Sequence, residues 1–129
     1  MDYLNVNSDG CPIVDTLQEK GSDMFNSELD HLLNQLLKAL GCTEDKTYQI
    51  GKFMLADLQL FDMKQRDYGE NNISKFGEFG VLVRASDKLE RLTTLLDSGR
   101  LPSNESVEDS WQDLALYSTI ARAVRNGTW

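Results

Sequence analysis

The 129-residue sequence lacks several features that would assign it quickly to a class of proteins. Its two cysteines, Cys11 and Cys42, lie far apart without CxxC spacing, and there is one histidine, so neither a zinc site nor a disulfide framework is expected. We therefore predict reduced thiols in a cytoplasmic protein. No apolar run approaches the roughly 20 residues that span a bilayer. The acidic N-terminal region does not resemble a secretory signal.

Nucleotide-binding signatures are also missing, and basic residues are scarce. The chain contains neither GxxxxGK[ST] nor GxGxxG, which argues against a P-loop and a dinucleotide-binding fold. Its 13 Lys and Arg against 21 Asp and Glu give a net charge of −8, which argues against binding to duplex nucleic acid. From Lys64 to Arg100, however, seven basic residues face six acidic ones. A small phosphorylated ligand could be held there, directly or through a divalent cation.

Helical periodicity is the main pattern that is present. It predicts a single all-α domain over residues 1–129, an antiparallel bundle of about four to five helices, with residues 1–26 partly irregular. The chain has several aromatic residues for short helices to cover, so a homo-oligomer is expected. The expected helices lie at about 27–40, 47–65, 81–96 and 106–124.

The first expected helix carries a dense leucine stripe. Ser27 followed by Asp30 resembles a capping box, and Gly41 is typical of a helix C-terminus. Leucines at helical spacing predict a packed face, and they are Leu29, Leu32, Leu33, Leu36, Leu37 and Leu40.

Charged residues interrupt the apolar faces of the other three helices. At 100° per residue, Lys88 projects inside the apolar arc of its helix, Arg84 and Arg91 lie at the border, and Asp87 lies just beyond. The residues expected to form that arc are Val81, Ala85, Leu89, Leu92 and Leu96. Asp57 and Lys64 face the apolar side of the second helix, and Asp109 and Asp113 begin the apolar ridge of the last. Trp111 is expected in the core.

Buried charges are usually paired or face a ligand, and helical angles do not separate these two interpretations. One is a network of internal salt bridges, for instance Asp113 with Lys88 and Asp57 with Lys64. The other is a site in which carboxylates hold Mg²⁺ while Arg and Lys hold phosphate oxygens.

Three motifs occur in the order found in a known family. The stretches "KQRDYG", "FGEFGVLVRASDKLERL" and "ESVEDSWQDLALYSTIA" resemble the nucleotide-modification-associated domain of the first type, which is common in phage genomes. The resemblance covers about residues 50–125. Its signature positions here are Lys64, Asp67, Tyr68 and Gly69, then Arg84, Asp87, Lys88 and Arg91, then Asp109, Asp113, Leu114 and Tyr117.

The resemblance implies a nucleotide ligand and a distant similarity to MazG-type all-α nucleotide pyrophosphatases. The EExxE element of those enzymes is absent; Asp87 to Glu90 supplies a DxxE in its place, and Glu105 or Glu108 could supply further carboxylates. The implied phosphate-binding residues are Lys64, Tyr68, Arg84, Lys88, Arg91 and Tyr117, and the implied Mg²⁺ ligands are Asp87, Asp109 and Asp113.

Three functions are therefore open. The first is an Mg²⁺-dependent nucleoside triphosphate pyrophosphatase, with a metal-bound water as nucleophile. The second is a phage protein that sequesters a nucleotide, such as a cyclic signal of host defence, without catalysis. The third is a structural or interaction protein whose inner charges form only salt bridges.

Overall fold

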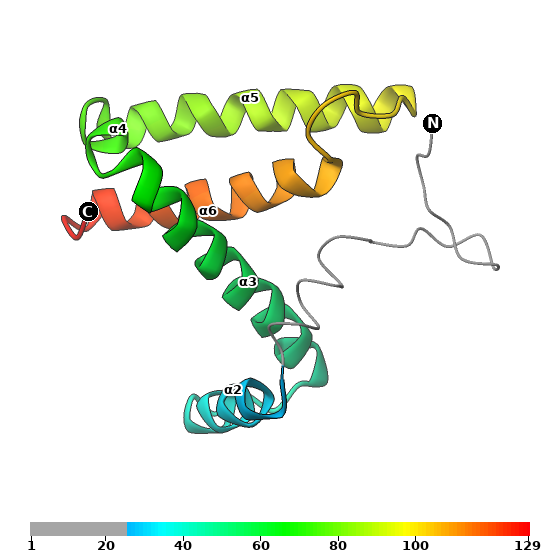
Figure 1. Cartoon of the computed structure of the whole chain (residues 1–129), viewed down its shortest axis with the longest axis vertical. Helices are drawn as coiled ribbons and strands as arrows, with labels where there is room; N and C mark the ends of the chain where they lie inside the picture. The colour runs from blue at the N-terminus through cyan, green and yellow to red at the C-terminus, as the bar shows by residue number, and fades with distance from the viewer. Residues whose placement is uncertain (1–25) are drawn as a thin grey trace. The chain divides into compact units, whose positions relative to one another are not determined.

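The computed structural model describes residues 26–129, and the regular structure in this range is entirely helical. This confirms the all-α prediction. The irregular segment predicted at residues 1–26 lies, except for residue 26, outside the described residues. The helices are α2 (Ser27–Ala39), α3 (Asp45–Tyr68), α4 (Asn71–Ser74), α5 (Gly77–Ser98) and α6 (Val107–Arg125), as Figure 1 shows. None of them has the length and apolar character that crossing a bilayer requires.

The chain divides into two compact units, one ending at Ala56 and the other running from Asp57 to Trp129. The first holds α2 and the beginning of α3, and the second holds the rest of α3 with α4, α5 and α6. One continuous helix, α3, thus runs through both units, so the single-domain expectation stays a prediction.

In the first unit, α2 packs on the beginning of α3 through one leucine. Leu33 is 4% exposed, and a Cβ at Gly51 would lie 3.3 Å from one of its methyl groups, so the glycine relieves a tight contact between the two helices. The hydroxyl of Tyr48 donates a hydrogen bond to Asp30. One neighbouring helix covers only part of the leucine stripe. The expected packed face is therefore wrong for Leu32, Leu36 and Leu40, which are exposed.

The ends of α2 show one correct and one wrong prediction. The N-cap is Asn26, not Ser27, because the Asn26 side chain accepts hydrogen bonds from the amides of Glu28 and Leu29. Gly41 terminates the helix as expected, with a φ of 77° that favours glycine.

In the second unit, α5 and α6 lie side by side and form a helical hairpin (Figure 1). Val81 and Leu92 of α5 are buried, and so is Ile73 of the short helix α4, which replaces part of the loop expected before α5. Gly99 ends α5 in the left-handed conformation. Ser106 caps α6 in a complete capping box with Asp109.

The apolar face of α5 is narrower than its sequence indicates. Leu89 and Leu96 were expected beside Val81 and Leu92, yet they are 55% and 60% exposed. Trp111 of α6, expected in the core, is 48% exposed. The neighbouring helices, mainly α6, cover only a narrow strip of α5, so residues at the edge of a wide apolar arc remain outside it.

Candidate functional site

The centre of the candidate site is the carboxylate of Asp113 on α6, which two ammonium groups share. Lys64 of α3 places its Nζ 2.6 Å from Asp113 Oδ1, and Lys88 of α5 places its Nζ 2.9 Å from Asp113 Oδ2. The Asp113 side chain is 11% exposed and that of Lys88 is 19% exposed. Three helices therefore each contribute one charged group to a single cluster.

The two ion pairs named from the sequence have different outcomes. The pair between Lys88 and Asp113 is confirmed. The pair between Asp57 and Lys64 is wrong: these residues are seven positions apart on one helix, about 10 Å along its axis. Lys64 instead pairs with Asp113, and Asp57 accepts a hydrogen bond from Gln112 Nε2 at 3.1 Å.

Burial and pairing act in opposite directions on the titration of the cluster. Burial alone would raise the pKa of Asp113, but the hydrogen bonds and positive charges of Lys64 and Lys88 outweigh it and lower that pKa. Burial alone would lower the pKa of Lys88, but hydrogen bonds to Glu105 and Asp113 outweigh it and raise that pKa. The Glu105 contact is 2.6 Å long. Both groups are therefore held in their charged forms.

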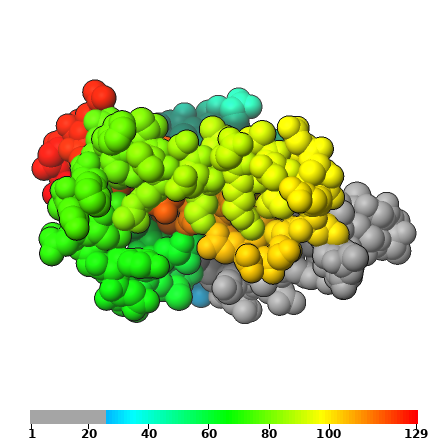
Figure 2. Space-filling view, turned by 90° about the horizontal axis from the view of Figure 1, so that it is seen from above, coloured from blue at the N-terminus to red at the C-terminus, as the bar shows by residue number. Residues whose placement is uncertain are grey.

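Arg91 joins α5 to the start of α6. Its Nη1 donates to Ser110 Oγ at 2.5 Å and to the Ser106 carbonyl oxygen at 3.2 Å, and its Nη2 donates to the Glu105 carbonyl oxygen. Figure 2 shows the orange segment that begins α6 lying beside the yellow-green and yellow side chains of α5. The planar guanidinium can bind several oxygens at once, so Arg91 fixes the loop that carries Glu105.

Arg84, on the same side of α5 as Lys88, also binds a carbonyl group. Its Nη2 donates to the Asn72 carbonyl oxygen at 3.3 Å. Neither Arg84 nor Arg91 forms an ion pair with a carboxylate of residues 26–129. Among the described residues, both guanidinium groups are thus held by carbonyl and hydroxyl oxygens rather than by carboxylates.

A second group of polar residues lies at the edge of the cluster. Burial raises the pKa of Asp57, although the hydrogen bond from Gln112 partly offsets the effect. Burial also raises the pKa of Glu108, and the negative charges of Asp57 and Asp109 raise it further. These carboxylates are therefore less stable as anions than isolated ones.

The residues predicted to hold phosphate are only partly brought together. Lys64 and Lys88 bind the Asp113 carboxylate, and Lys88 also binds that of Glu105. Arg91 binds Ser110 and the Glu105 carbonyl oxygen, and Arg84 lies one turn from Lys88 on α5. Tyr68 is 65% exposed at the end of α3. Tyr117 lines a separate pocket between α5 and α6.

The three predicted metal ligands do not form one group. Asp87 is exposed and Asp113 is engaged by two lysines. Asp109 accepts hydrogen bonds from the Ser106 amide and hydroxyl in the capping box. Within residues 26–129, no three His, Cys, Asp or Glu side chains are placed so that they could hold a metal ion. The predicted trio is therefore not gathered at one point, and the Mg²⁺ site stays a prediction.

Two partners in the cluster, Ser110 and Gln112, were not predicted from the sequence, and both are buried on α6. Both are uncharged, so a search for inward-facing charges passes over them. The motif Ser-x-x-Asp at 106–109 was a usable signal, since a capping box there assigns Asp109 to the helix end.

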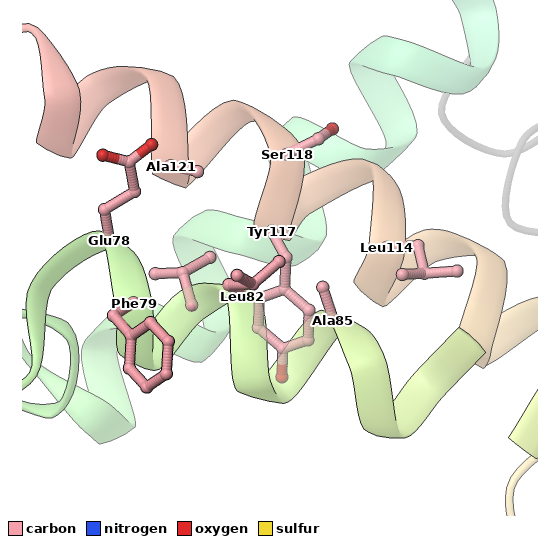
Figure 3. Close-up of a pocket in the computed structure, with 9 residues that line it drawn as sticks. Glu78, Phe79, Leu82, Ala85, Leu114, Tyr117, Ser118 and Ala121 are labelled. Atoms are coloured by element: carbon pink, nitrogen blue, oxygen red, sulfur yellow. The ribbon is translucent and has the colours of Figure 1, made fainter. Parts of the chain in front are cut away.

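A pocket of about 460 Å³ lies between α5 and α6 and is lined mainly by apolar side chains. Figure 3 shows Phe79, Leu82 and Ala85 on α5 and Leu114, Tyr117 and Ala121 on α6, with the Tyr117 ring directed toward α5. None of the charged residues of the ionic cluster lines it.

The fold and the site define an all-α protein whose inter-helix contacts include a partly buried ionic cluster. Comparisons of the chain with models of protein families, with curated proteins and with solved structures find no match. Any function therefore has to be inferred from the residues themselves.

Proposed function

We propose that this protein binds a phosphorylated nucleotide in the cytoplasm, with Arg84, Lys88 and Arg91 of α5 contacting phosphate oxygens. The observation that supports the proposal is that two part-buried guanidinium groups on one side of α5 bind neutral oxygens and no described carboxylate. Because neither guanidinium group forms an ion pair with a described carboxylate, both are available to an anionic ligand.

Phosphate can reach this cluster because two of its members are accessible. The side chain of Lys64 is 43% exposed, and Glu105, which covers Lys88, is 55% exposed. A phosphate that displaced Glu105 would accept hydrogen bonds from Lys88 without leaving a buried carboxylate unpaired. The resemblance to a nucleotide-associated family extends the proposal from phosphate to nucleotide.

Two outcomes for the bound nucleotide are compatible with this proposal. In one, the protein hydrolyses a nucleoside triphosphate with Mg²⁺; in the other, it sequesters the nucleotide intact, as a phage protein acting against a host signal would. The engagement of Asp113 by two lysines and of Asp109 by the helix cap favours binding by the basic side chains alone. The purely structural interpretation predicts no ligand.

The test is to incubate the protein with a pool of nucleoside triphosphates and cyclic nucleotides, with MgCl₂ or with EDTA. The supernatant is chromatographed before and after heat denaturation. We expect stoichiometric loss of one nucleotide that returns intact on heating and is indifferent to EDTA. Monophosphate and pyrophosphate formed only with MgCl₂ would instead establish the enzyme. No change in the pool in either buffer would contradict nucleotide binding.

The assignment of the site depends on a matched pair of variants. Arg84→Ala removes one hydrogen bond and one cation, and we expect at least a tenfold weaker binding of the captured nucleotide, measured by calorimetry. Arg122→Ala removes the same charge from an exposed position of α6 and is expected to bind like the unmodified protein. Equal losses in both variants would mean that only the overall charge matters.

A further inference from the structure

Helix α5 has a second apolar stripe, which α6 does not cover. Phe79, Leu82, Leu89 and Leu96 are 72%, 61%, 55% and 60% exposed. Together with Ser86 and Thr93 they follow an alternating spacing of three and four residues over most of the helix. That spacing is the one by which a helix packs along the length of a neighbouring helix.

Helix α6 carries a matching stripe. Trp111, Leu114, Ser118 and Ala121 follow the same alternation, and Trp111 is 48% exposed. The pocket of about 460 Å³ lies between the two stripes. Phe79 and Leu82 line it from α5, and Leu114, Ser118 and Ala121 line it from α6. Figure 3 shows these side chains along both helices. The two stripes therefore form one surface, which we call the open face.

The open face is distinct from the ionic cluster. Arg84 follows Leu82 by two residues, and Arg91 follows Leu89 by two, so each arginine projects about 200° around α5 from the corresponding leucine. The cluster and the open face thus lie on different sides of the same helix. A role of the open face in association therefore does not depend on nucleotide binding.

The open face has the area and composition of an interface. None of the ten stripe positions is charged, and an ion pair at its edge joins Arg125 to Glu78 at 3.0 Å. Its five exposed large side chains leave on the order of 500 Å² of apolar surface, since an aromatic side chain carries roughly 150–250 Å². A standard interface buries about 800 Å² per partner, somewhat over half of it apolar. The exposed apolar surface of the open face is therefore about as large as the apolar part of a standard interface.

We propose that the open face packs against the open face of a second copy of this chain, so that two α5–α6 hairpins form a four-helix interface. The face is self-complementary: bulky Phe79 and Leu82 line a hollow whose other lining residues include the small side chains of Ala85, Ser118 and Ala121. Under two-fold symmetry, the bulky side chains of one copy enter the hollow of the other, and the reverse contact forms at the same time.

Sedimentation equilibrium of the full chain over a wide concentration range tests the proposal. The unmodified protein is expected to be a dimer. The double variant Leu82→Glu/Leu89→Glu is expected to dissociate at least roughly a hundredfold more readily, because each copy would bury two unpaired carboxylates. The control Met63→Glu introduces a carboxylate at an equally exposed apolar position of α3 and is expected to leave the dimer intact. Unchanged helical circular dichroism would show that the variants are folded.

A cysteine in the centre of the face gives an independent readout. In a chain whose Cys11 and Cys42 are replaced by serine, Ser86→Cys is expected to form an intermolecular disulfide under mild oxidation, and the control Asp67→Cys, at an exposed position of α3, is not. A monomer at all concentrations would overturn the proposal. The proposal would also be overturned if the double variant remained a dimer and Ser86→Cys formed no intermolecular disulfide, because the two copies would then associate through another surface.

Discussion

The two sides of α5 reverse the usual distribution of residues between the inside and the outside of a protein. On one side, Lys88 is 19% exposed and held by two carboxylates. On the other side, Leu82 and Leu89 are more than half exposed. Charge is buried where α3 and α6 provide partners, and apolar surface is exposed where the described residues of the second unit provide none.

A helix face therefore cannot be interpreted without its neighbours. Burial of a charge is tolerable when hydrogen bonds and an opposite charge replace water, as they do around Asp113. Exposure of many large apolar side chains in one continuous patch is unusual for a monomer and indicates an interaction surface. The difference between the two sides of α5 can be tested by substitutions on α5 and by substitutions of the charged residues on α3 and α6.

The largest loss of stability is expected at Leu92, which is buried on α5 between its charged side and its exposed apolar side. Leu92 is 1% exposed, and Leu92→Ala should lower the free energy of unfolding by about 3 kcal/mol, because it removes buried methyl groups and leaves a cavity. Leu96→Ala, one turn further along, should cost less than about 1 kcal/mol in dilute protein. Urea unfolding followed by circular dichroism measures both. Equal losses would mean that Leu96 is covered within the chain.

A smaller loss is expected in the ionic cluster. Asp113→Ala leaves Lys64 and Lys88 without their shared carboxylate and should cost about 2 kcal/mol at pH 7, whereas the exposed control Asp97→Ala should cost almost nothing. The folded pKa of Asp113 is lowered, so its stabilisation is present above the ordinary carboxyl pKa and is lost as pH falls through the folded value. The difference from the unmodified protein should therefore shrink in strong acid. A difference that is constant with pH would contradict the pairing.

The smallest effect, and the only stabilising one, is expected at Asp57. Because its folded pKa is raised, the ionised group is destabilising at neutral pH, and this effect disappears below the ordinary carboxyl pKa. Asp57→Asn retains an acceptor for Gln112 and should increase stability at pH 7 by less than about 1 kcal/mol, allowing for solvent screening. Asp67→Asn is the exposed control on the same helix. The stabilities of the two variants are compared by thermal unfolding at pH 7 and at about pH 3.5, which is below the ordinary carboxyl pKa. An equal gain in stability for Asp57→Asn at the two pH values would refute the electrostatic explanation.

Several features of the fold follow from local sequence. The periodicity of the apolar residues predicts the helices, Gly41 marks the end of α2, and the position of Lys88 among apolar neighbours predicts that it points inward. The prediction was wrong about the N-cap of α2, which is Asn26 rather than the neighbouring Ser27. Both residue types are good caps, so sequence alone ranks them poorly.

The partners of the charged residues were only partly predicted: the pair between Lys88 and Asp113 was, and the others were not. The sequence-based argument paired Lys64 with Asp57 on its own helix, but Lys64 pairs with Asp113, 49 positions away. Asp109 and Asp113 share one helix face at i and i+4, yet one belongs to the capping box and the other is buried between lysines. Which oxygen a side chain meets depends on how the helices pack.

The sequence by itself determined that this protein is helical, where the helices lie and that charged residues project toward their inner sides, because these properties depend on interactions within a few turns of chain. Only the tertiary structure decided that Asp113 is the centre of the cluster, that Arg84 and Arg91 bind no described carboxylate, and that α5 keeps a second apolar side open. The physical reason is that helical spacing fixes the direction of a side chain, whereas burial and pairing depend on which other element lies in that direction.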